Sequence, residues 1–438
     1  MVFFNRDASS VSKKEKYDVK KTSMIVIDDV LWEQVRLDTG EFGYIGWNSK
    51  KHKLLEFKKS VSDKTQKIRY IPMNDGAVES DAVLLPSDAV DYVNEEGLEN
   101  EIKEFIWKWL DVSDEYREKA AWYVMLTWIT DNLNTVPYLR PIGDYGTGKT
   151  RFEDTVGGLC YKAMFFGGAA SVAPIYRMMN TWKGTLVLDE FNLDRSDAKS
   201  DIIQILNNGY QRGKPIHRCN PNDVTKVDTF DPFGPKIMVT RMRFNDKALE
   251  SRCLTEQMKE TTRKDIPIDL TKEFFEGRNQ LRNKLLMYRF KTWNKIDVEQ
   301  SMFIDFGDIM PRIKQTFLPF TVLFYNDKDR LDGFVKYVQE YNQKIVEENA
   351  SSFDGQLINS YVELLNNGSD DITVQDILDK TILNGGCKSN TNVRTVGKHL
   401  KVLGFNEPVI KKIDGKSVRV TNVSNHVLER IKRKYVVS

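Results

Sequence analysis

Eight residues of this chain have the types and the spacing that bind a phosphate chain. Gly143-Asp144-Tyr145-Gly146-Thr147-Gly148-Lys149-Thr150 matches G-x-x-x-x-G-K-[ST] in full and follows a strand-like segment, residues 137–142. Glycines let backbone N–H groups surround phosphate oxygens, Lys149 reaches the β and γ oxygens, and the Thr150 hydroxyl holds Mg²⁺. The motif therefore predicts a site for ATP with Mg²⁺; the alternative is a glycine turn before an ordinary helix.

A second motif follows about forty residues later. Residues 184–190 form an apolar run that ends in Asp189 and Glu190, as expected of a buried parallel strand. Ligands of open α/β sheets bind at the carboxyl ends of the strands. We expect Asp189 to complete the Mg²⁺ shell and Glu190 to polarise the attacking water, since phosphoryl transfer depends on positioning and charge neutralisation. The alternative is a buried strand that happens to end in two acids.

Composition indicates a globular protein of several domains with an uneven charge. The chain has 438 residues, 40% of them hydrophobic, and a formal net charge of +2. Residues 371–438 carry 13 lysines and arginines against 6 acids, whereas the preceding 370 residues carry 52 against 57. A basic C-terminal part suggests an acidic partner, and nucleic acid is the first candidate.

Cysteine spacing and hydropathy suggest a cytoplasmic protein. The four cysteines are far apart and have no metal-ligand spacing, so we interpret them as reduced packing residues. The N-terminus lacks the pattern of a signal peptide, and the most apolar stretch, residues 120–129, is too short to span a bilayer. We therefore expect no membrane partner.

After the second motif the pattern predicts a helix, a hairpin and another core strand. Isoleucines and leucines recur at helical period in residues 198–211. Two strand-like segments, 214–219 and 224–228, then flank the turn residues 220–223. The apolar run 235–240 follows and ends in Thr240. This order is typical of a βαβ-based nucleotide sheet.

In this context the residues resemble the AAA+ ATPase family. Leu249-Glu250-Ser251-Arg252-Cys253 is similar to the Ser-Arg-Cys motif of clamp-loader ATPases, whose arginine reaches the active site of a neighbouring subunit. Thr240, eleven residues before Ser251, stands where that family keeps its sensor 1 residue. The resemblance implies a ring in which Arg252 stabilises transition-state charge; the alternative is a surface arginine after a helix.

A sensor 2 arginine is also expected in the helical lid of such an ATPase. Residues 310–313 are similar to the Pro-Arg helix start that carries sensor 2 in the bacterial Holliday-junction motor, which points to Arg312. Arg278 and Arg282, on a nearby basic helix, are competing candidates.

The inserted hairpin resembles the pre-sensor 1 hairpin of minichromosome-maintenance and viral superfamily 3 helicases. In those helicases the hairpins line a central pore and grip single-stranded DNA. The resemblance implies phosphate contacts from four side chains, namely Lys214, His217, Arg218 and Lys226. The hairpin departs from that pattern because it is short and its Pro-Asn-Asp tip is not basic.

The C-terminal residues resemble a winged-helix domain, with helices over 372–383 and 390–403 and a β-wing over 408–421. A helix in the major groove beside a basic ribbon is a recurring geometry for duplex contact, while winged helices also dock proteins. The candidate DNA contacts are Arg394, Lys398 and Lys401 on the second helix and Lys411, Lys412, Lys416 and Arg419 on the wing.

The expected fold class is α/β, an AAA+ P-loop nucleotide sheet with a helical lid, a β-rich N-terminal domain and a C-terminal winged-helix domain. The expected boundaries are a polar tail at 1–22, the β-rich domain at 23–95, a helical collar at 96–136, the ATPase core at 137–268, the lid at 269–350 and the winged helix at 351–438. Wider likeness to P-loop ATPases of phages and plasmids suggests a role in replication of a mobile element.

These features favour a hexameric, ring-forming DNA helicase or translocase driven by ATP. Two other functions stay open. One is an initiator or loader that uses ATP as an assembly switch, and the other is a protein-remodelling ATPase.

Overall fold

The structure is a computed structural model that describes residues 17–168, 171–189, 197–220, 223–244, 246–413 and 416–436. The chain divides into two compact units, Met1–Glu299 and Gln300–Ser438. The first contains the N-terminal strands and a parallel sheet, and the second is helical with one two-stranded ribbon. The division falls inside residues 269–350, where the sequence suggests a single lid.

Short strands dominate the N-terminal part of the first unit. Four strands form an antiparallel sheet in the order β2-β3-β4-β5, and three form a second sheet in the order β1-β7-β6. Their bounds are β1 Asp18–Lys21, β2 Met24–Ile27, β3 Val30–Arg36, β4 Phe42–Asn48, β5 Lys53–Lys58, β6 Val61–Asp63 and β7 Ile68–Ile71. A short helix, α1 (Gly76–Glu79), follows, and the Asp75 side chain caps its start by accepting from the backbone N–H groups of Ala77 and Val78.

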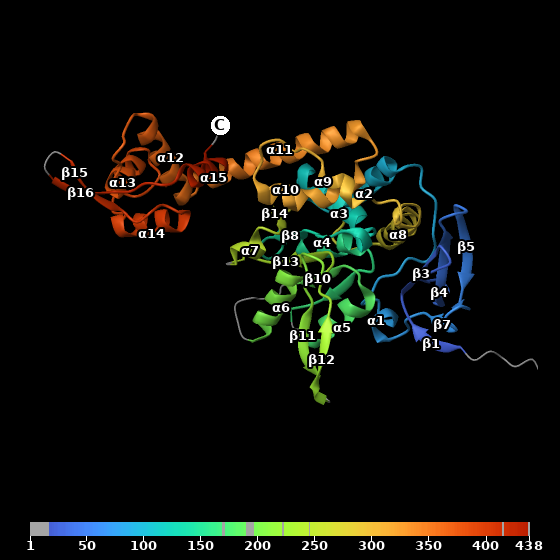
Figure 1. Ribbon diagram of the computed structural model, residues 1–438. Coiled ribbons are helices and arrows are strands. Elements are labelled where there is room, and N and C mark those ends of the chain that lie inside the picture. The colour runs from blue at the N-terminus through green and yellow to red at the C-terminus, as the bar shows by residue number, and fades with distance from the viewer. Residues whose placement is uncertain are drawn as a thin grey trace, which may run out of the picture. The chain divides into compact units, whose positions relative to one another are not determined.

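A five-stranded parallel sheet forms the core of the first unit, in the order β14-β8-β13-β10-β9 (Figure 1). The strands are β8 Tyr138–Ile142, β9 Met164–Phe166, β10 Leu186–Asp189, β13 Lys236–Val239 and β14 Cys253–Gln257. All residues of β8 and β13 are buried, as expected of strands covered on both faces. The predicted mixed α/β fold with a parallel sheet is confirmed, and it is consistent with a P-loop nucleotide-binding fold.

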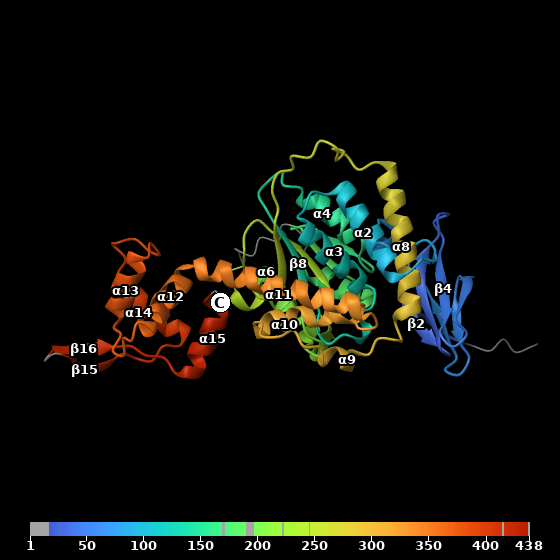
Figure 2. The same cartoon turned by 90° about the horizontal axis from the view of Figure 1, so that it is seen from above.

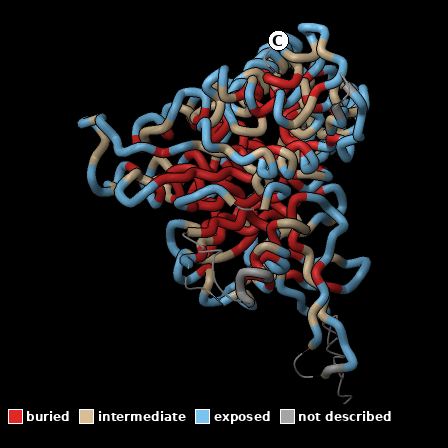
Figure 3. Tube along the Cα trace, turned by 90° about the vertical axis from the view of Figure 1, so that its left-hand side faces the viewer, coloured by how far each residue is buried: buried red, intermediate tan, exposed pale blue. Residues whose placement is uncertain are grey.

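Helices cover this sheet and fill the connections between its strands. They are α2 Glu95–Trp109, α3 Asp114–Thr127, α4 Lys149–Thr155, α5 Val172–Trp182, α6 Asp197–Asn208, α7 Lys247–Glu250 and α8 Lys272–Thr292, with 3-10 turns η1 Thr130–Asn132 and η2 Gly157–Leu159. Helix α8 lies between the N-terminal strands and the rest of the unit (Figure 2). The buried residues, red in Figure 3, include the strands of the parallel sheet.

Aromatic side chains of α2, of α3 and of Trp128, the residue after α3, mostly pack in the core of the first unit. Six of these seven are buried, namely Phe105, Trp109, Tyr116, Trp122, Tyr123 and Trp128. Trp107 is 52% exposed. Its ring stacks against the Arg263 guanidinium, whose carbon atom Cζ lies 4.4 Å from the ring centre. These aromatic residues therefore belong to packed faces of the two helices, except at Trp107.

The predicted hairpin is present as β11 (Ile216–Asn220) and β12 (Asp223–Phe230), which pair antiparallel with each other. It extends away from the parallel sheet (Figure 1). Two residues of the predicted tip, Pro221 and Asn222, lie outside the described residues. A buried lysine, Lys236, donates from Nζ to the carbonyl oxygens of Pro232 (2.8 Å) and Gly234 (2.9 Å) and so fixes the base of the hairpin to the sheet.

The second unit contains seven helices with bounds in the described residues and one antiparallel ribbon. They are α9 Val298–Met302 at its start, α10 Pro311–Phe317, η3 Leu318–Leu323, α11 Lys328–Ser351, α12 Phe353–Asn366, α13 Val374–Leu383, α14 Val393–Leu403, β15 Val409–Ile413, β16 Lys416–Val420 and α15 Asn425–Tyr435. Leucine, isoleucine and aromatic side chains from α12, α13, α14 and α15 form one core. Residues 414 and 415, the predicted wing turn, lie outside the described residues.

A buried ionic cluster joins the N-terminal sheet to the core of the first unit. The Glu33 carboxylate on β3 accepts from Lys162 Nζ (2.9 Å), Arg289 Nε (2.7 Å) and the Tyr161 hydroxyl (2.8 Å). Glu33, Lys162 and Arg289 are each at most 2% exposed. Arg289 also pairs with Asp131, and although burial alone would raise the pKa of Asp131, this guanidinium holds that pKa below its usual value.

Glu33→Gln should destabilise the first unit by about 3–5 kcal/mol, because it leaves two buried cations without their shared counter-charge. Urea unfolding followed by tryptophan fluorescence measures the loss. Glu41→Gln is the matched control, since Glu41 pairs with Lys59 at the surface and should change stability by no more than about 0.5 kcal/mol. Equal stabilities for the two variants would show that the cluster does not hold the sheet in place.

Candidate nucleotide-binding site

The P-loop residues form a tight turn between β8 and α4. Gly146 and Gly148 have φ angles of +76° and +84°, in the left-handed region that favours glycine. Gly143 is required for a different reason, because a Cβ there would lie 2.4 Å from Thr147 Oγ1 and 3.2 Å from the Met258 carbonyl oxygen. The three glycines therefore allow a backbone path that other residues would strain.

Hydrogen bonds within the loop hold its charged residue in place. The Asp144 carbonyl oxygen accepts from Thr147 Oγ1 (2.8 Å) and from Lys149 Nζ (2.6 Å). Lys149 is 7% exposed at the first position of α4, whereas Thr150 next to it is exposed. The lysine ammonium thus reaches back over the loop, which is the position that a phosphate-binding cation needs.

The ends of three neighbouring strands bring the other predicted residues beside this loop. Asp189 ends β10 and lies opposite Val239 of β13. Thr240, directly after β13, bridges to Ile142, and its carbonyl oxygen accepts from the Gly143 N–H (3.2 Å). Because the strands are parallel, their carboxyl ends meet at one edge of the sheet. Lys149, Asp189 and Thr240 therefore share that edge, and their roles at a nucleotide stay a prediction.

The donor set at this edge suits a magnesium ion bound through few protein groups. Mg²⁺ commonly uses one or two protein oxygens together with substrate phosphates and water. The Thr150 hydroxyl and the Asp189 carboxylate are oxygens of that kind. In the part of the chain that the structure describes, no cluster of three or more His, Cys, Asp or Glu side chains could hold a metal on its own. Glu190, the predicted water-polarising residue, lies outside the described residues.

Arg252 lies at the opposite edge of the sheet from the P-loop. Its carbonyl oxygen accepts from the N–H of Tyr138, the first residue of β8, and the next residue, Cys253, is in register with Tyr138. The guanidinium Nη1 donates to the Asn207 carbonyl oxygen (3.0 Å) and also contacts the Asn207 side-chain oxygen. The five residues of β8 separate this arginine from the P-loop by about 16 Å.

The three sensor 2 candidates lie in different surroundings. Arg312 follows Pro311 at the start of α10, and its Nη1 donates to Gln315 Oε1 (2.5 Å). Arg278 on α8 approaches the Asp154 carbonyl oxygen at 3.5 Å, near the end of the P-loop helix and not its start. Arg282, one turn further along α8, is buried. Which of them serves as sensor 2 stays a prediction.

One residue beside the loop was missed by the sequence reasoning. The Arg241 guanidinium lies 3.7 Å from the ring centre of Tyr145, an exposed aromatic residue of the P-loop. Arg241 directly follows Thr240, so its position at the site follows once β13 is recognised. The sequence contains a signal for this contact, since Arg241 follows the end of a predicted strand and Tyr145 is an aromatic residue of the P-loop; a cation and an aromatic ring that lie close together attract each other.

The four basic residues in and beside the hairpin differ in the polar partners that their side chains already have. Arg218 is tied to the base of the hairpin by Asp201 (2.5 Å) and the Tyr176 hydroxyl (3.0 Å), and these hydrogen bonds raise its pKa. Lys226 pairs with Asp223 at 3.1 Å in an exposed i,i+3 contact, and His217 Nδ1 lies 3.1 Å from Thr229 Oγ1. Lys214 is exposed. Arg218 is therefore the least available of the four for a phosphate.

The basic residues of α14 and the ribbon are largely exposed. Arg394 and Lys398 lie one turn apart on α14 and, like Lys412 and Arg419 on the ribbon, have no acidic partner among the described residues. Lys401 pairs with Glu407 and Lys411 with Asp371, both at 2.5 Å and both in exposed pairs. The Lys416 side chain lies outside the described part of the chain.

Comparisons with known proteins give only distant likenesses. No family model matches the chain, and no curated protein matches it. Among solved structures, the chain is similar to the apo C-terminal region of NrS-1, with a TM-score of 0.40 and 13% identity over 84% of this chain and 83% of that chain. A structure of the Thermotoga maritima RuvB Holliday junction branch migration motor aligns with a TM-score of 0.23 and 12% identity, over 74% of this chain and 97% of that chain.

Hydropathy adds one further observation. None of the helices within the described ranges combines the length and the apolar character that a bilayer crossing requires.

Gly143→Ala should lower the affinity for ATP at least tenfold, because the new methyl group would displace Thr147 and the loop that holds Lys149. Equilibrium binding of a fluorescent ATP analogue measures the change. Gly76→Ala is the control, since a Cβ at Gly76 meets nothing within 4 Å. Unchanged affinity in Gly143→Ala would mean that this loop does not surround the phosphates.

Proposed function

We propose that this protein is an ATP-hydrolysing, ring-forming motor that acts on DNA, most specifically a helicase or translocase that replicates a mobile genetic element. The observation that carries the proposal is the division of the predicted catalytic residues between the two edges of one sheet. Lys149, Asp189 and Thr240 share the P-loop edge, and Arg252 lies at the other.

The residues at the P-loop edge have separate tasks in this proposal. When bound, Mg²⁺ neutralises phosphate charge and orients the β and γ phosphates. Thr150 and Asp189 would hold the ion, and Lys149 would exchange the Asp144 carbonyl for phosphate oxygens. Thr240, next to the loop, would orient the attacking water together with Glu190. ATP is favoured as the substrate because the resemblance to AAA+ ATPases and the P-loop agree on it.

Arg252 requires a second subunit in order to act on a nucleotide. A separation of about 16 Å along β8 exceeds the reach of an arginine side chain from its own backbone to its own P-loop. A residue at this edge can therefore serve only a nucleotide held by a neighbour. Repetition of that contact with closure generates a ring, and we propose a homo-hexamer.

Contact with DNA is supported more strongly by the C-terminal part than by the hairpin. Arg394, Lys398, Lys412 and Arg419 are exposed and lack acidic partners among the described residues, within a segment that carries a surplus of basic residues. We propose that α14 and the ribbon form a winged-helix surface for duplex DNA. The hairpin would contact a single strand in the ring through Lys214, His217 and Lys226.

A second candidate function is favoured by the hairpin itself. Its Arg218 is held by Asp201 and Tyr176, and it also carries the acids Asp223 and Asp228. A hairpin with few free cations grips a phosphate backbone weakly. An initiator or loader that uses ATP to assemble on DNA, without processive unwinding, fits that observation better than a fast motor does.

ATP hydrolysis should be stimulated by DNA and abolished by Lys149→Ala, since this variant removes the cation that the P-loop places on the phosphates. The measurement compares turnover without DNA, with single-stranded DNA and with a forked duplex that reports strand separation. Stimulation with unwinding supports the helicase. Stimulation without unwinding selects the initiator or loader, and indifference to DNA would point to a protein-remodelling ATPase.

Arg252→Ala should reduce turnover by about 10³-fold or more while leaving ATP binding intact. Mixing it with Lys149→Ala should restore part of the activity, because a mixed ring contains interfaces with an intact P-loop on one subunit and an intact Arg252 on the next. Arg243→Ala is the control, since Arg243 is an exposed arginine nearby. Activity in Arg252→Ala alone, or no recovery on mixing, would contradict a role across the interface.

A further inference from the structure

A pair of exposed side chains lies beside the P-loop at positions that no motif specifies. The Arg241 guanidinium stacks on the Tyr145 ring, with its Cζ 3.7 Å from the ring centre. Arg241 is exposed and Tyr145 is 71% exposed, so neither side chain belongs to the core. A cation–π contact at the surface contributes little to stability. Stability of the fold therefore does not account for this pair, and its place beside the loop points to the nucleotide.

Lys149 shows where along the loop the terminal phosphates bind. The ammonium of a P-loop lysine reaches the β and γ oxygens of the bound triphosphate. Here Lys149 Nζ donates to the Asp144 carbonyl oxygen at 2.6 Å. That oxygen and the Tyr145 N–H belong to one planar peptide unit, so Tyr145 is the loop residue beside the place of the terminal phosphates. Arg241 is joined to this part of the loop through the Tyr145 ring.

The backbone of Arg241 is tied to the start of the same loop. The preceding residue, Thr240, bridges to Ile142 at the end of β8, and the Thr240 carbonyl oxygen accepts from the Gly143 N–H at 3.2 Å. Arg241 thus starts beside the first P-loop residue, and its guanidinium lies on Tyr145, two residues further along the loop. Both ends of this side chain are therefore fixed at the phosphate edge of their own subunit.

A stacked guanidinium is well suited to bind a phosphate. The contact with an aromatic ring uses the planar face of the group, whereas its N–H groups point outward in the plane and match phosphate oxygens in pairs. The charge balance of this edge favours a second cation beside Lys149. Two carboxylates, Asp144 and Asp189, belong to the same edge, and a triphosphate adds further negative charge. Neutralisation of that charge is a main requirement of phosphoryl transfer.

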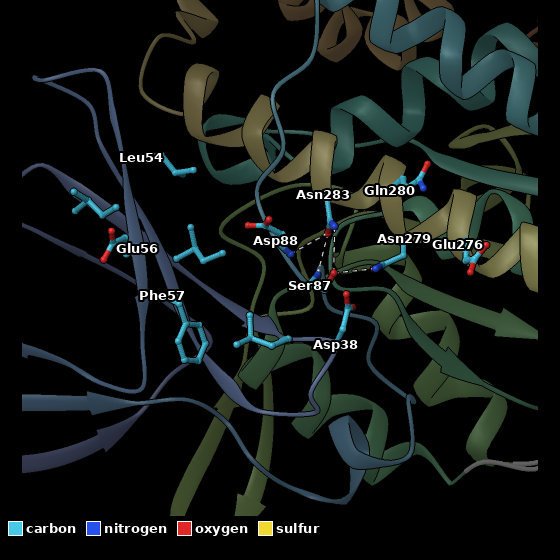
Figure 4. Close-up of a pocket in the computed structure, with 13 residues that line it drawn as sticks. Asp38, Leu54, Glu56, Phe57, Ser87, Asp88, Glu276, Asn279, Gln280 and Asn283 are labelled. Carbon is cyan, nitrogen blue, oxygen red and sulfur yellow. Dashed lines mark hydrogen bonds between the residues drawn. The ribbon is translucent and has the colours of Figure 1, made fainter.

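Another concave region of the first unit has the opposite charge. A hollow of about 870 Å³ lies between β5 and α8 and is lined by four acids, Asp38, Glu56, Asp88 and Glu276 (Figure 4). No lysine or arginine is among the described residues that line it. These carboxylates would repel a triphosphate, whereas the P-loop edge offers it two cations.

We infer that Arg241 binds the terminal phosphate of the ATP in its own subunit, and that the Tyr145 ring holds the guanidinium in place for this contact. The inference rests on the proposed ATPase function and adds a residue that determines nucleotide specificity. The backbone N–H groups of a P-loop surround phosphates that ATP and ADP share. Arg241 instead contacts the phosphate that only ATP carries, so it makes the site prefer ATP to ADP.

Calorimetric titration of the full chain with Mg²⁺ and either ADP or the non-hydrolysable β,γ-imido analogue of ATP tests the inference. Arg241→Gln should lower the affinity for the ATP analogue about 10- to 100-fold, as expected for the loss of a hydrogen bond between charged groups. The affinity for ADP should stay unchanged, which also shows that the variant is folded. Arg243→Gln is the matched control, because this exposed arginine of the same segment lies 3.3 Å from Glu250 instead, and it should leave both affinities unchanged.

The part played by the ring is measured in the same titrations. Tyr145→Phe retains the aromatic ring and should retain the preference for the ATP analogue over ADP. Tyr145→Ser removes the ring and should lower that preference, in the same direction as Arg241→Gln. An unchanged preference in Tyr145→Ser would show that the ring does not hold the guanidinium for its contact with the phosphate.

The ratio of the two affinities decides the outcome. If Arg241→Gln keeps the ratio of the parent protein, Arg241 does not contact the terminal phosphate, and the inference falls while the proposed ATPase stands. Equal losses for the ATP analogue and ADP would assign Arg241 to the structure of the loop and would also overturn the inference. Absence of nucleotide binding by the parent would overturn the proposed ATPase, and this inference with it.

Turnover in mixed samples separates a contact within the subunit from one across the interface. Arg241→Gln should recover part of its activity when mixed with Arg252→Ala, since one subunit then supplies an intact nucleotide edge and its neighbour an intact Arg252. It should not recover with Lys149→Ala, because both variants are defective at the nucleotide edge. Recovery with Lys149→Ala, or none with Arg252→Ala, would contradict a contact within the subunit.

Discussion

The ionic cluster around Glu33 determines how the first unit is held together. One carboxylate neutralises Lys162 and Arg289, and Arg289 in turn holds Asp131. These residues come from β3, the turn before β9, helix α8 and η1, which are four segments far apart in the sequence. Buried charges tolerate little displacement, since the loss of a partner leaves an uncompensated ion. The N-terminal sheet is therefore an integral part of the first unit and not a tethered module.

This arrangement also places α8 with respect to the P-loop helix. Arg289 fixes one end of α8, while Arg278, near the other end, lies against the last turn of α4 and against Gly158, where a Cβ would approach Arg278 Cδ at 2.7 Å. A single helix thus contacts both the N-terminal sheet and the helix that carries Lys149.

Local patterns predicted the parts of the structure that are encoded locally. The P-loop turn, the strands β8, β10 and β13 and the inserted hairpin follow from glycine spacing, apolar runs and turn residues, and each lies where the sequence indicates. The other two parallel strands, β9 and β14, were not predicted. Strand β3 was missed because Glu33 and Gln34 are buried in it through partners that lie elsewhere in the chain. For the same reason the sequence could not show that Arg218 is tied to Asp201, that Arg241 stacks on Tyr145, or that two guanidinium nitrogens of Arg282 are buried without a hydrogen-bond partner among the described residues.

On the proposed ring, Arg252 would have two alternative partners, Asn207 of its own subunit and the nucleotide of the neighbouring subunit. In a single chain, Asn207 accepts a hydrogen bond from the Arg252 guanidinium. Because both residues belong to the same subunit, Asn207 competes with a neighbour's phosphate for this guanidinium at a high effective concentration. A neutral amide and a carbonyl group are weaker partners for a guanidinium than a phosphate is. On the proposed ring, the arginine would leave Asn207 only where the adjacent subunit holds a triphosphate. Release of Arg252 from Asn207 would then couple the conformation of α6 to the nucleotide state of the adjacent subunit. Hydrolysis of ATP in one subunit would depend on its neighbour, so the subunits of the ring would hydrolyse ATP in sequence and not at random.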